Sequence, residues 1–162
     1  SNVTGVVQDV ASITSIAHER GGILVLDAAQ SLGQVPCDQP GWNADVVAAP
    51  AHKWLLGTSG AGILWAREGI DIEPLIQGGT GSMSDSLAMP ATFVERMEAG
   101  APDVPAAAAL ESAIRWLEAR SIASVGGTTL ALADACAGEL SAIRRIRVSG
   151  GQRGAPIVSF TV

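Results

Sequence analysis

Ile23-Leu24-Val25-Leu26-Asp27, four apolar β-forming residues that end abruptly at a carboxylate, decides the fold prediction. Such a continuous run is typical of a strand in a parallel sheet that is covered on both faces. The preceding residues 10–20 have the apolar spacing of a short amphipathic helix, with Val10, Ile13 and Ala17 on one face. A helix followed by a buried strand predicts an α/β layered architecture.

Further strands are expected downstream, each marked by a short apolar run beside a turn signal. Residues 45–49 and 63–66 are strand candidates on either side of a glycine-rich segment at 57–62, and residues 34–38 form an extended piece before a turn at 39–41. Two more extended pieces are expected near the end of the chain, at 146–149 and 157–162.

The middle of the chain has a different composition. Glycine, serine, methionine and proline dominate residues 77–103, and so long an irregular segment is typical of a functional loop or a subunit contact. Asp103 then has the place of an N-cap for a helix that ends at Arg120. The apolar stripe of this helix consists of Ala107, Leu110, Ile114 and Leu117. A second helix is expected at about 128–143.

The composition excludes some classes of function. The net charge is −6 and the most basic stretch is only residues 144–147, which disfavours nucleic-acid binding. No apolar run approaches the roughly 18 residues of a membrane span, and the first residues lack a signal-peptide pattern. Cys37 and Cys136 lie far apart without metal-ligand spacing, so we expect ordinary thiols in a reducing, cytoplasmic compartment.

Lys53 is the one lysine of the chain, against nine arginines. It lies beside His52, between the apolar runs 46–49 and 54–56, and such neighbours predict desolvation, which favours a neutral amine. A neutral amine is what a lysine needs to form a Schiff base with a carbonyl compound or with pyridoxal phosphate. A codon preference for arginine explains the count equally well, so the surrounding residues decide the question.

Polar residues follow two of the predicted strands. Asp27 and Gln30 follow the first, and His52 and Lys53 follow the strand at 45–49. In a parallel sheet both pairs would lie at one rim, where ligands collect. Pyridoxal phosphate needs a lysine for its aldehyde, a carboxylate for its ring nitrogen, and donors for its ring oxygen and phosphate. Taken alone, Asp27 is better explained as the start of a turn.

Five short runs, in order along the chain, resemble class V aminotransferases. They are Ser-Asn-Val-Thr-Gly at 1–5, Asp-Ala-Ala-Gln-Ser at 27–31, Ala-His-Lys at 51–53, Gly-Gly-Thr-Gly-Ser at 78–82 and Glu-Ala-Gly-Ala-Pro at 98–102. Within that family the chain most resembles cysteine desulfurases and selenocysteine lyases. The resemblance implies fold-type I of pyridoxal-phosphate enzymes, with a mostly parallel sheet in a large domain (1–120) and a smaller α+β domain that begins in 121–162. It also implies a homodimer in which a loop of one subunit helps to close the site of the other.

The resemblance implies a role for each matching residue at the rim. Lys53 would form the Schiff base with pyridoxal phosphate and later move the α-proton of the substrate. Asp27 would pair with the ring nitrogen, Gln30 would hydrogen-bond the ring oxygen, and His52 would contact the phosphate.

Two further matches and three departures complete the comparison with the family pattern. Asn2 would lie near the cofactor oxygen and the substrate carboxylate, while Thr80 and the segment ending at Ala101 are candidates for the loop that closes the other subunit's site. Pro50 stands where a serine or threonine usually donates to the phosphate, Ala51 replaces a glycine, and Ala101 replaces a threonine. Two lost hydrogen bonds of this kind would weaken cofactor binding by about two to four orders of magnitude.

Other parts of the family pattern are expected outside this chain. They are an upstream phosphate loop with a ring-stacking histidine, and a downstream loop with the nucleophilic cysteine and a substrate-binding arginine. Cys37, Cys136 and Arg153 do not match those positions. Residues 1–5 resemble a loop after an absent strand and residues 157–162 a strand cut short, so we expect a central fragment of a longer protein.

The leading hypothesis is a pyridoxal-phosphate enzyme that converts cysteine or selenocysteine to alanine and passes sulfur or selenium to an acceptor such as a protein. Two alternatives stay open. One is another class V enzyme, such as an aminotransferase, an epimerase-like protein or a kynureninase-like hydrolase. The other is a non-catalytic truncated homologue, favoured by the thinned phosphate site and opposed by the retained residues 27, 30, 52 and 53. For the chain by itself we expect weak or no cofactor binding and no turnover.

Overall fold

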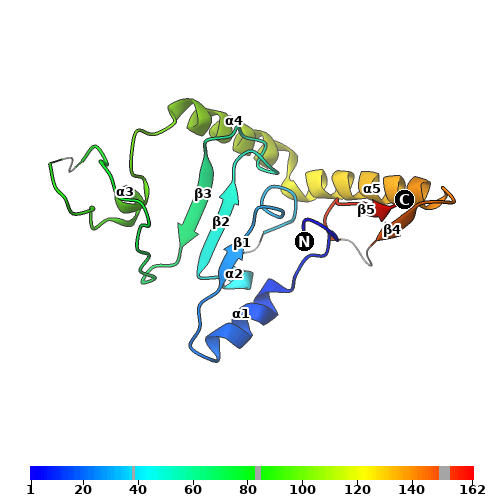
Figure 1. Ribbon diagram of the computed structural model, residues 1–162, viewed down its shortest axis with the longest axis horizontal. Coiled ribbons are helices and arrows are strands. Elements are labelled where there is room, and N and C mark those ends of the chain that lie inside the picture. Colours follow the sequence, from blue (N-terminus) through cyan, green and yellow to red (C-terminus); the bar gives the residue numbers. More distant parts are fainter. Residues whose placement is uncertain (38, 83–84, 150–153) are drawn as a thin grey trace.

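The computed structural model describes residues 1–37, 39–82, 85–149 and 154–162 (Figure 1). The helices are α1 (Val10–His18), α2 (Gln39–Trp42), α3 (Phe93–Met97), α4 (Val104–Arg120) and α5 (Ile122–Ser141). The strands are β1 (Val25–Asp27), β2 (Val46–Pro50), β3 (Gly62–Ala66), β4 (Arg147–Ser149) and β5 (Ser159–Thr161). Within these ranges, β1, β2 and β3 form one sheet, and β4 pairs with β5 in another. Helices and a mixed sheet thus make up an α/β arrangement.

The central strand of the larger sheet is β2. It pairs in parallel with β1, with Asp27 opposite Ala48, as expected. It pairs antiparallel with β3, with Pro50 opposite Gly62, so the sheet of this chain is mixed rather than mostly parallel. The reason is the short β2–β3 connection, which leaves no room for the crossover helix that a parallel return requires.

One face of this sheet packs against α4 and forms the core. Val47 of β2 lies in a buried cluster with Leu117, and Leu110 packs against that cluster. Both leucines belong to the stripe predicted for this helix. Ala106, however, is the buried alanine in the first turn, whereas Ala107 is exposed. Burying a leucine of this kind contributes about 1.5–3 kcal/mol, so this face holds the sheet in place.

The opposite face of the sheet is largely open. Val25 of β1 is 62% exposed and Leu64 of β3 is 44% exposed. The expectation that β1 would be covered on both faces is therefore wrong for this chain. Its apolar run is compatible with two-sided burial, but the described residues bury only the side that faces α4.

Two short elements differ from the predictions. Residues 31–35 form turns and a bend, and residues 36 and 37 are irregular, so no strand forms in 34–37, while residue 38 lies outside the described part. The helix α2 begins at residue 39, where a turn was predicted, and α3 forms inside the segment predicted to be irregular. Short helices of this length lack the periodicity that a sequence pattern can reveal.

Two predictions for the longer helices also need correction, namely the buried face of α1 and the first residue of α5. In α1 the buried side chain is Thr14, whereas Ile13 of the predicted apolar face is 43% exposed. The helix α5 begins at Ile122 rather than near residue 128. Ser121 has φ 63, which ends α4, and its hydroxyl accepts from the Ser124 N–H, which caps α5. A capping residue between two helices thus moved the start of α5 upstream.

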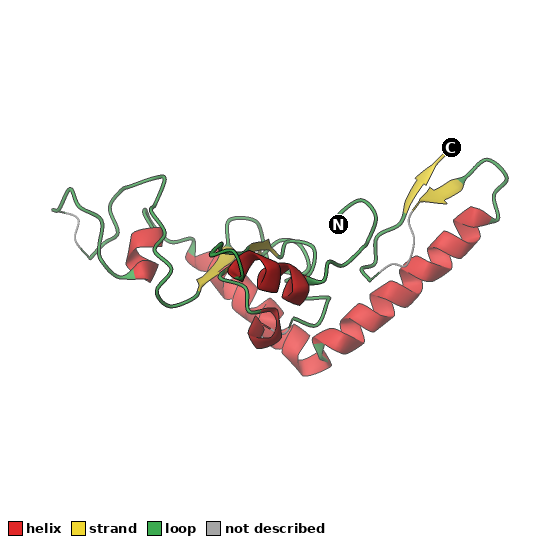
Figure 2. Ribbon diagram, turned by 90° about the horizontal axis from the view of Figure 1, so that it is seen from below, coloured by secondary structure: helices red, strands yellow, loops and turns green. Residues whose placement is uncertain are grey.

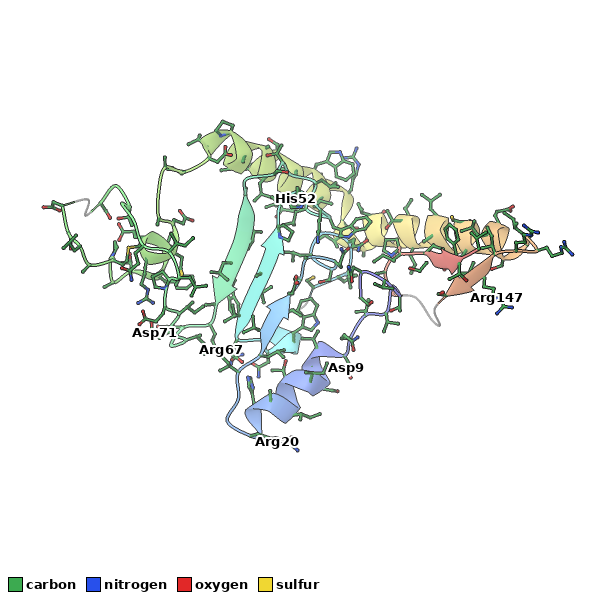
Figure 3. All side chains as sticks on the ribbon, in the orientation of Figure 1. Asp9, Arg20, His52, Arg67, Asp71 and Arg147 are labelled. Carbon is green, nitrogen blue, oxygen red and sulfur yellow. The ribbon has the colours of Figure 1, made fainter. Side chains whose placement is uncertain are left out.

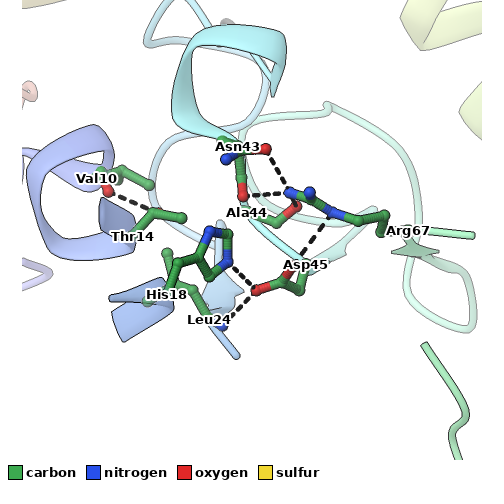
Figure 4. Close-up of polar contacts among 8 residues, drawn as sticks. All are labelled: Val10, Thr14, His18, Leu24, Asn43, Ala44, Asp45 and Arg67. Atoms are coloured by element: carbon green, nitrogen blue, oxygen red, sulfur yellow. Dashed lines mark hydrogen bonds and ion pairs between the residues drawn. The ribbon is translucent and has the colours of Figure 1, made fainter. Parts of the chain in front are cut away.

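A buried carboxylate ties α1 and β3 to the start of β2 (Figure 4). Asp45 is 4% exposed. Its Oδ2 lies 2.8 Å from His18 Nε2 and accepts from the Leu24 N–H at 2.7 Å, and its Oδ1 lies 3.2 Å from Arg67 Nε. The hydrogen bond with His18, and next that from Leu24, hold the pKa of Asp45 below its usual value. The sequence analysis gave Asp45 no role beyond starting a strand.

The helix α5 extends away from the larger sheet with the β4–β5 hairpin beside it (Figure 2). The domain boundary expected at residue 120 coincides with the break between α4 and α5 and stays a prediction. Within the described residues, no helix is both long enough and apolar enough to cross a bilayer.

Candidate functional site

Strand pairing brings Asp27 and the His52–Lys53 pair to one rim of the larger sheet. Asp27 ends β1 opposite Ala48, and β2 continues to Pro50 before the turn that carries His52 and Lys53. Because a strand rises about 3.3 Å per residue, this offset along the strands is roughly 7 Å. Figure 3 shows His52 at this end of β2, far from Arg67 at the other end. At this rim the carboxylate of Asp27 therefore precedes the imidazole of His52 and the amine of Lys53 along the direction of the parallel strands.

Lys53 lies in a closed turn. The N–H of Gly57 donates to the Ala51 carbonyl at 2.9 Å, and the N–H of Leu56 donates to the Lys53 carbonyl at 3.0 Å. Ala51 in turn donates to the Ala61 carbonyl at 3.0 Å, which anchors the turn to the start of β3. Leu56 adopts φ 60, a left-handed conformation that costs a leucine about 1–2 kcal/mol. The backbone of Lys53 is thus held on both sides.

The side chain of Lys53 is exposed, and so is that of His52. Desolvation of the amine was expected from its apolar neighbours in sequence, and that expectation is wrong for this chain. The turn directs Leu55 inward, where it is 5% exposed, and directs Lys53 outward. Neighbours along a turn do not share a direction, so an apolar flank does not by itself desolvate a side chain.

Asp27 has two roles at the rim. Its Oδ1 accepts from the Ala29 N–H at 2.9 Å, which is the turn-starting function foreseen as the alternative for this residue. The side chain also borders a cavity of about 590 Å³, whose other walls include Pro50 of β2 and Phe93 of α3. A second, smaller cavity of about 100 Å³ lies between Asp27, Gln30 and the N-terminal residues. One carboxylate therefore both shapes the loop and faces ligand-accessible space.

Gln30 is held by hydrogen bonds at both its main chain and its side chain. Its Oε1 accepts from the indole Nε1–H of Trp54 at 2.9 Å. Its backbone carbonyl accepts from Nε2 of Gln34 at 2.7 Å, and Gln34 is 2% exposed. The contact with Trp54 joins the loop after β1 to the turn after β2, and the bond from Gln34 lies within the loop after β1.

The remaining predicted residues, Asn2 and Thr80, are not brought into this group. Asn2 is exposed in an N-terminal turn, and its neighbour Ser1, rather than Asn2, borders the small cavity with Asp27 and Gln30. Thr80 is half-buried and borders a different cavity, of about 880 Å³, together with Ala101 and other residues near α4. The N-terminal turn is therefore close to the rim, whereas Thr80 borders a cavity that adjoins the one beside Asp27 and shares Gly62, Val94 and Glu98 with it.

The sequence matches the family described as aminotransferase class-V over residues 1–162. This chain belongs to that family.

Several relatives of this class-V aminotransferase chain are described as cysteine desulfurases. A probable cysteine desulfurase 2 of Mycobacterium leprae is 37% identical, and the match covers 100% of this chain and 40% of that protein. A probable cysteine desulfurase of Pyrococcus abyssi is 36% identical over 73% of this chain and 30% of that protein. The solved cysteine desulfurase of Thermococcus onnurineus has a TM-score of 0.82 and 30% identity, and covers 100% of this chain and 42% of its own. The chain thus spans 30–40% of the length of these curated relatives.

Pyridoxal phosphate is the cofactor that the class-V aminotransferase family implies, and the chemistry of the rim side chains is compatible with the ring of that cofactor. When bound, it supplies an electron sink for bonds at the α-carbon of an amino acid. Asp27 offers a carboxylate with unused lone pairs for a protonated ring nitrogen, and Gln30 offers an amide N–H for a ring oxygen. The exposed amine of Lys53 is accessible to an aldehyde.

The phosphate end fits less well. Pro50 lies at the end of β2 without a hydroxyl or an N–H to donate. Ala101 contributes no hydroxyl either, and it borders the cavity of Thr80. His52 is the exposed candidate donor that the rim itself carries. The class-V aminotransferase chain therefore provides partners for the ring more completely than for the phosphate.

The two cysteines have no contact with the rim that would make them nucleophiles. Burial raises the pKa of Cys37 to about 11, and its Sγ donates to the Val35 carbonyl at 3.1 Å. A thiol with so high a pKa is a poor nucleophile at neutral pH, because the thiolate is the reactive form. Cys136 is exposed on α5. Arg153 lies outside the described residues.

Trp54 and Leu56 were missed by the sequence analysis. Both were counted as parts of an apolar run, although Trp54 carries an N–H donor and Leu56 has a left-handed backbone. The indole beside a lysine, in a run otherwise made of leucines, was a signal that could have identified the first. No sequence signal indicates the second, because leucine rarely adopts φ above zero.

Proposed function

We propose that this chain forms the lysine-bearing part of the pyridoxal-phosphate site of a cysteine desulfurase-type enzyme. Such an enzyme removes sulfur from cysteine, leaves alanine, and passes the sulfur to an acceptor. The observation that carries the proposal is the placement of Asp27, Gln30 and Lys53 at one rim by the parallel pairing of β1 and β2. The names of the similar proteins support cysteine as the substrate.

In the proposed site the residues of this chain divide the work. Lys53 holds the cofactor aldehyde and moves the α-proton at its Nζ. Asp27 keeps the ring nitrogen protonated, since a carboxylate next to a cationic nitrogen favours the charged form. Gln30 donates to the ring oxygen, and His52 is the phosphate donor that compensates in part for Pro50. Asn2 is proposed for the substrate carboxylate.

The proposed protein is a cytoplasmic homodimer. Thr80 and Ala101 share a cavity that adjoins the cavity beside Asp27 without including Asp27, and we assign this surface a role toward the site of a second copy. Leu75 and Leu87, in the same part of the chain, are each 102% exposed. Apolar side chains so fully exposed are common in segments that are covered by a partner.

The test is a change of Lys53 to alanine or arginine in the complete protein loaded with pyridoxal phosphate. We expect the wild-type protein to have a visible absorbance band that borohydride fixes as a cofactor adduct on the peptide containing Lys53. Both variants should lose the adduct, because alanine lacks the amine and an arginine guanidinium stays charged. Lys53→Arg is the matched control for charge. An unchanged band and an adduct at another residue would refute the role of Lys53.

A second readout separates the two enzyme classes. Release of alanine and reducible sulfur from cysteine supports the desulfurase, whereas transfer of the amino group to an oxo acid supports another class-V enzyme. The half-buried thiol of Cys37 favours neither, because its raised pKa makes it unsuited to accept sulfur. A non-catalytic homologue would bind neither cofactor nor substrate. Pro50 and Ala101 favour this alternative, because neither residue carries a hydroxyl that could donate to the cofactor phosphate.

A further inference from the structure

Trp54 directs which end of the Gln30 side chain faces outward. The indole Nε1–H can only donate, so the Gln30 atom that lies 2.9 Å from it must be the carbonyl oxygen. This contact removes the usual ambiguity between the oxygen and nitrogen of a glutamine amide. The NH₂ group is then the end of the Gln30 amide that the indole leaves available to donate.

The two loops that bring Trp54 and Gln30 together are packed backbone against backbone. Gly33 has φ 99, and a Cβ on it would lie 2.1 Å from the Trp54 carbonyl oxygen. Gln34, beside it, donates to the Gln30 carbonyl at 2.7 Å. The loop after β1 is therefore fixed against the turn of Lys53, so the indole and the amide have little freedom to separate.

Gln30 and Asp27 border the same small cavity, of about 100 Å³. A flat ring that is held by the Asp27 carboxylate at its nitrogen would therefore lie near Gln30 as well. A donor at Gln30 favours an oxygen that carries negative charge, whereas a carbonyl in the same place would repel it. The orientation of one amide thus decides whether this position favours an anionic ring oxygen.

We propose that Trp54 is a positioning residue, which holds the Gln30 carbonyl so that the amide N–H is left to donate to the ring oxygen of the cofactor. This inference rests on the proposed function, because it requires pyridoxal phosphate at the rim. Trp54 acts through Gln30 and touches no reacting atom. Its effect is on the charge of the ring oxygen and on cofactor affinity.

The test is a spectrophotometric pH titration of the bound cofactor in the complete protein, with Trp54→Phe, Gln30→Glu and the double variant. Phenylalanine keeps an aromatic ring but cannot donate, and glutamate keeps the acceptor for the indole but loses the N–H donor. Losing a donor to the ring oxygen makes that oxygen more basic, so the titration midpoint should rise by about half to one pH unit. Cofactor affinity should fall by about 3- to 10-fold.

The double variant separates positioning from packing. If Trp54 acts through Gln30, Trp54→Phe adds no further shift of the midpoint in a Gln30→Glu background. Trp116→Phe is the matched control, since Trp116 lies on α4, 42% exposed, with its ring against Arg120, and its loss should leave the midpoint unchanged. If Trp54→Phe fails to fold, the indole N–H resonance of Trp54 gives the answer. It should lose its hydrogen-bonded shift in Gln30→Met and keep a hydrogen-bonded shift in Gln30→Glu.

The outcomes distinguish the two proposals. A visible cofactor band fixed on Lys53, with an unchanged midpoint in Trp54→Phe, overturns the role of Trp54 alone. An additive shift in the double variant, or an indole resonance that does not move in Gln30→Met, also overturns it. A wild-type protein without any cofactor band overturns the proposed function, and this inference with it.

Discussion

At the scale of single residues, Gly33 determines how closely the two rim loops approach. It is buried and has φ 99, a backbone conformation that glycine adopts at little cost. The Trp54 carbonyl oxygen occupies the space where a Cβ would lie. The turn that holds Lys53 therefore depends on a glycine, which has no Cβ, at position 33 in the loop after β1.

Gly33→Ala should lower the free energy of unfolding by about 2–4 kcal/mol, through backbone strain and the clash with Trp54. Gly100→Ala is the matched control: its φ is 101, but nothing lies within 4 Å of the added Cβ. It should cost only the strain, about 1 kcal/mol. Urea denaturation of both variants measures the difference. Equal losses would show that the approach of Trp54 is not rigid.

At the scale of elements, α4 is the helix that positions the core face of the sheet. It starts after Asp103, whose side chain accepts from the Ala106 N–H at 3.0 Å, and Pro105 lies in its first turn. The predicted N-cap is thus confirmed. Gly60, in the β2–β3 connection, lies so close that a Cβ there would meet Asp103 Oδ2 at 2.6 Å. The cap of α4 therefore also contacts the loop that follows Lys53's turn.

Asp103→Ala should destabilise the chain by about 1 kcal/mol, because the Ala106 N–H loses its acceptor. Asp103→Asn should restore most of this stability, since an asparagine oxygen caps a helix about as well. Thermal unfolding followed by circular dichroism at neutral pH compares the two. Destabilisation of the same size in both variants would point to the charge of Asp103 rather than its cap.

At the scale of the whole molecule, the larger sheet has a structural end and a rim. The ion cluster of Asp45, His18 and Arg67 joins α1 and β3 at one end of β2, and His52 lies at the other (Figures 3 and 4). Because the Asp45 carboxylate is buried and the side chains of His52 and Lys53 are exposed, the stability of the fold and the chemistry of the rim depend on different charges.

The cluster makes the fold sensitive to acid. The pKa of Asp45 is lowered in the folded chain, so its contribution is complete above the unfolded-state pKa of about 4 and is lost as the pH falls through the folded value. Asp45→Asn should cost about 2–4 kcal/mol at pH 7 and flatten the loss of stability below about pH 4. Asp71→Asn is the control, because its pair with Arg96 is exposed on the aspartate side. Urea unfolding of both variants at pH 7 and below about pH 4 measures the loss of stability. Equal losses in Asp45→Asn and Asp71→Asn would contradict the role of Asp45.

The sequence was sufficient for features that depend on local pattern. The apolar run at 23–26 and the strand before Lys53 predicted the parallel pair, and the N-cap at Asp103 predicted the start of α4. The pattern failed where three-dimensional context decides. Exposure of Lys53 follows from the direction of a turn, and the antiparallel β3 follows from a short connection. The contact of Trp54 with Gln30 joins residues that no periodicity relates.

The closed turn after β2 also limits how this region can change in evolution. Its length is set by the hydrogen bond from Gly57 back to Ala51, so one inserted or deleted residue would break the closure and move the amine relative to Asp27. In the described part of the stretch between β3 and α3, no backbone hydrogen bond joins this stretch to the turn of Lys53. Differences in chain length among natural relatives should therefore accumulate there, while the spacing from the aspartate to the lysine stays constant.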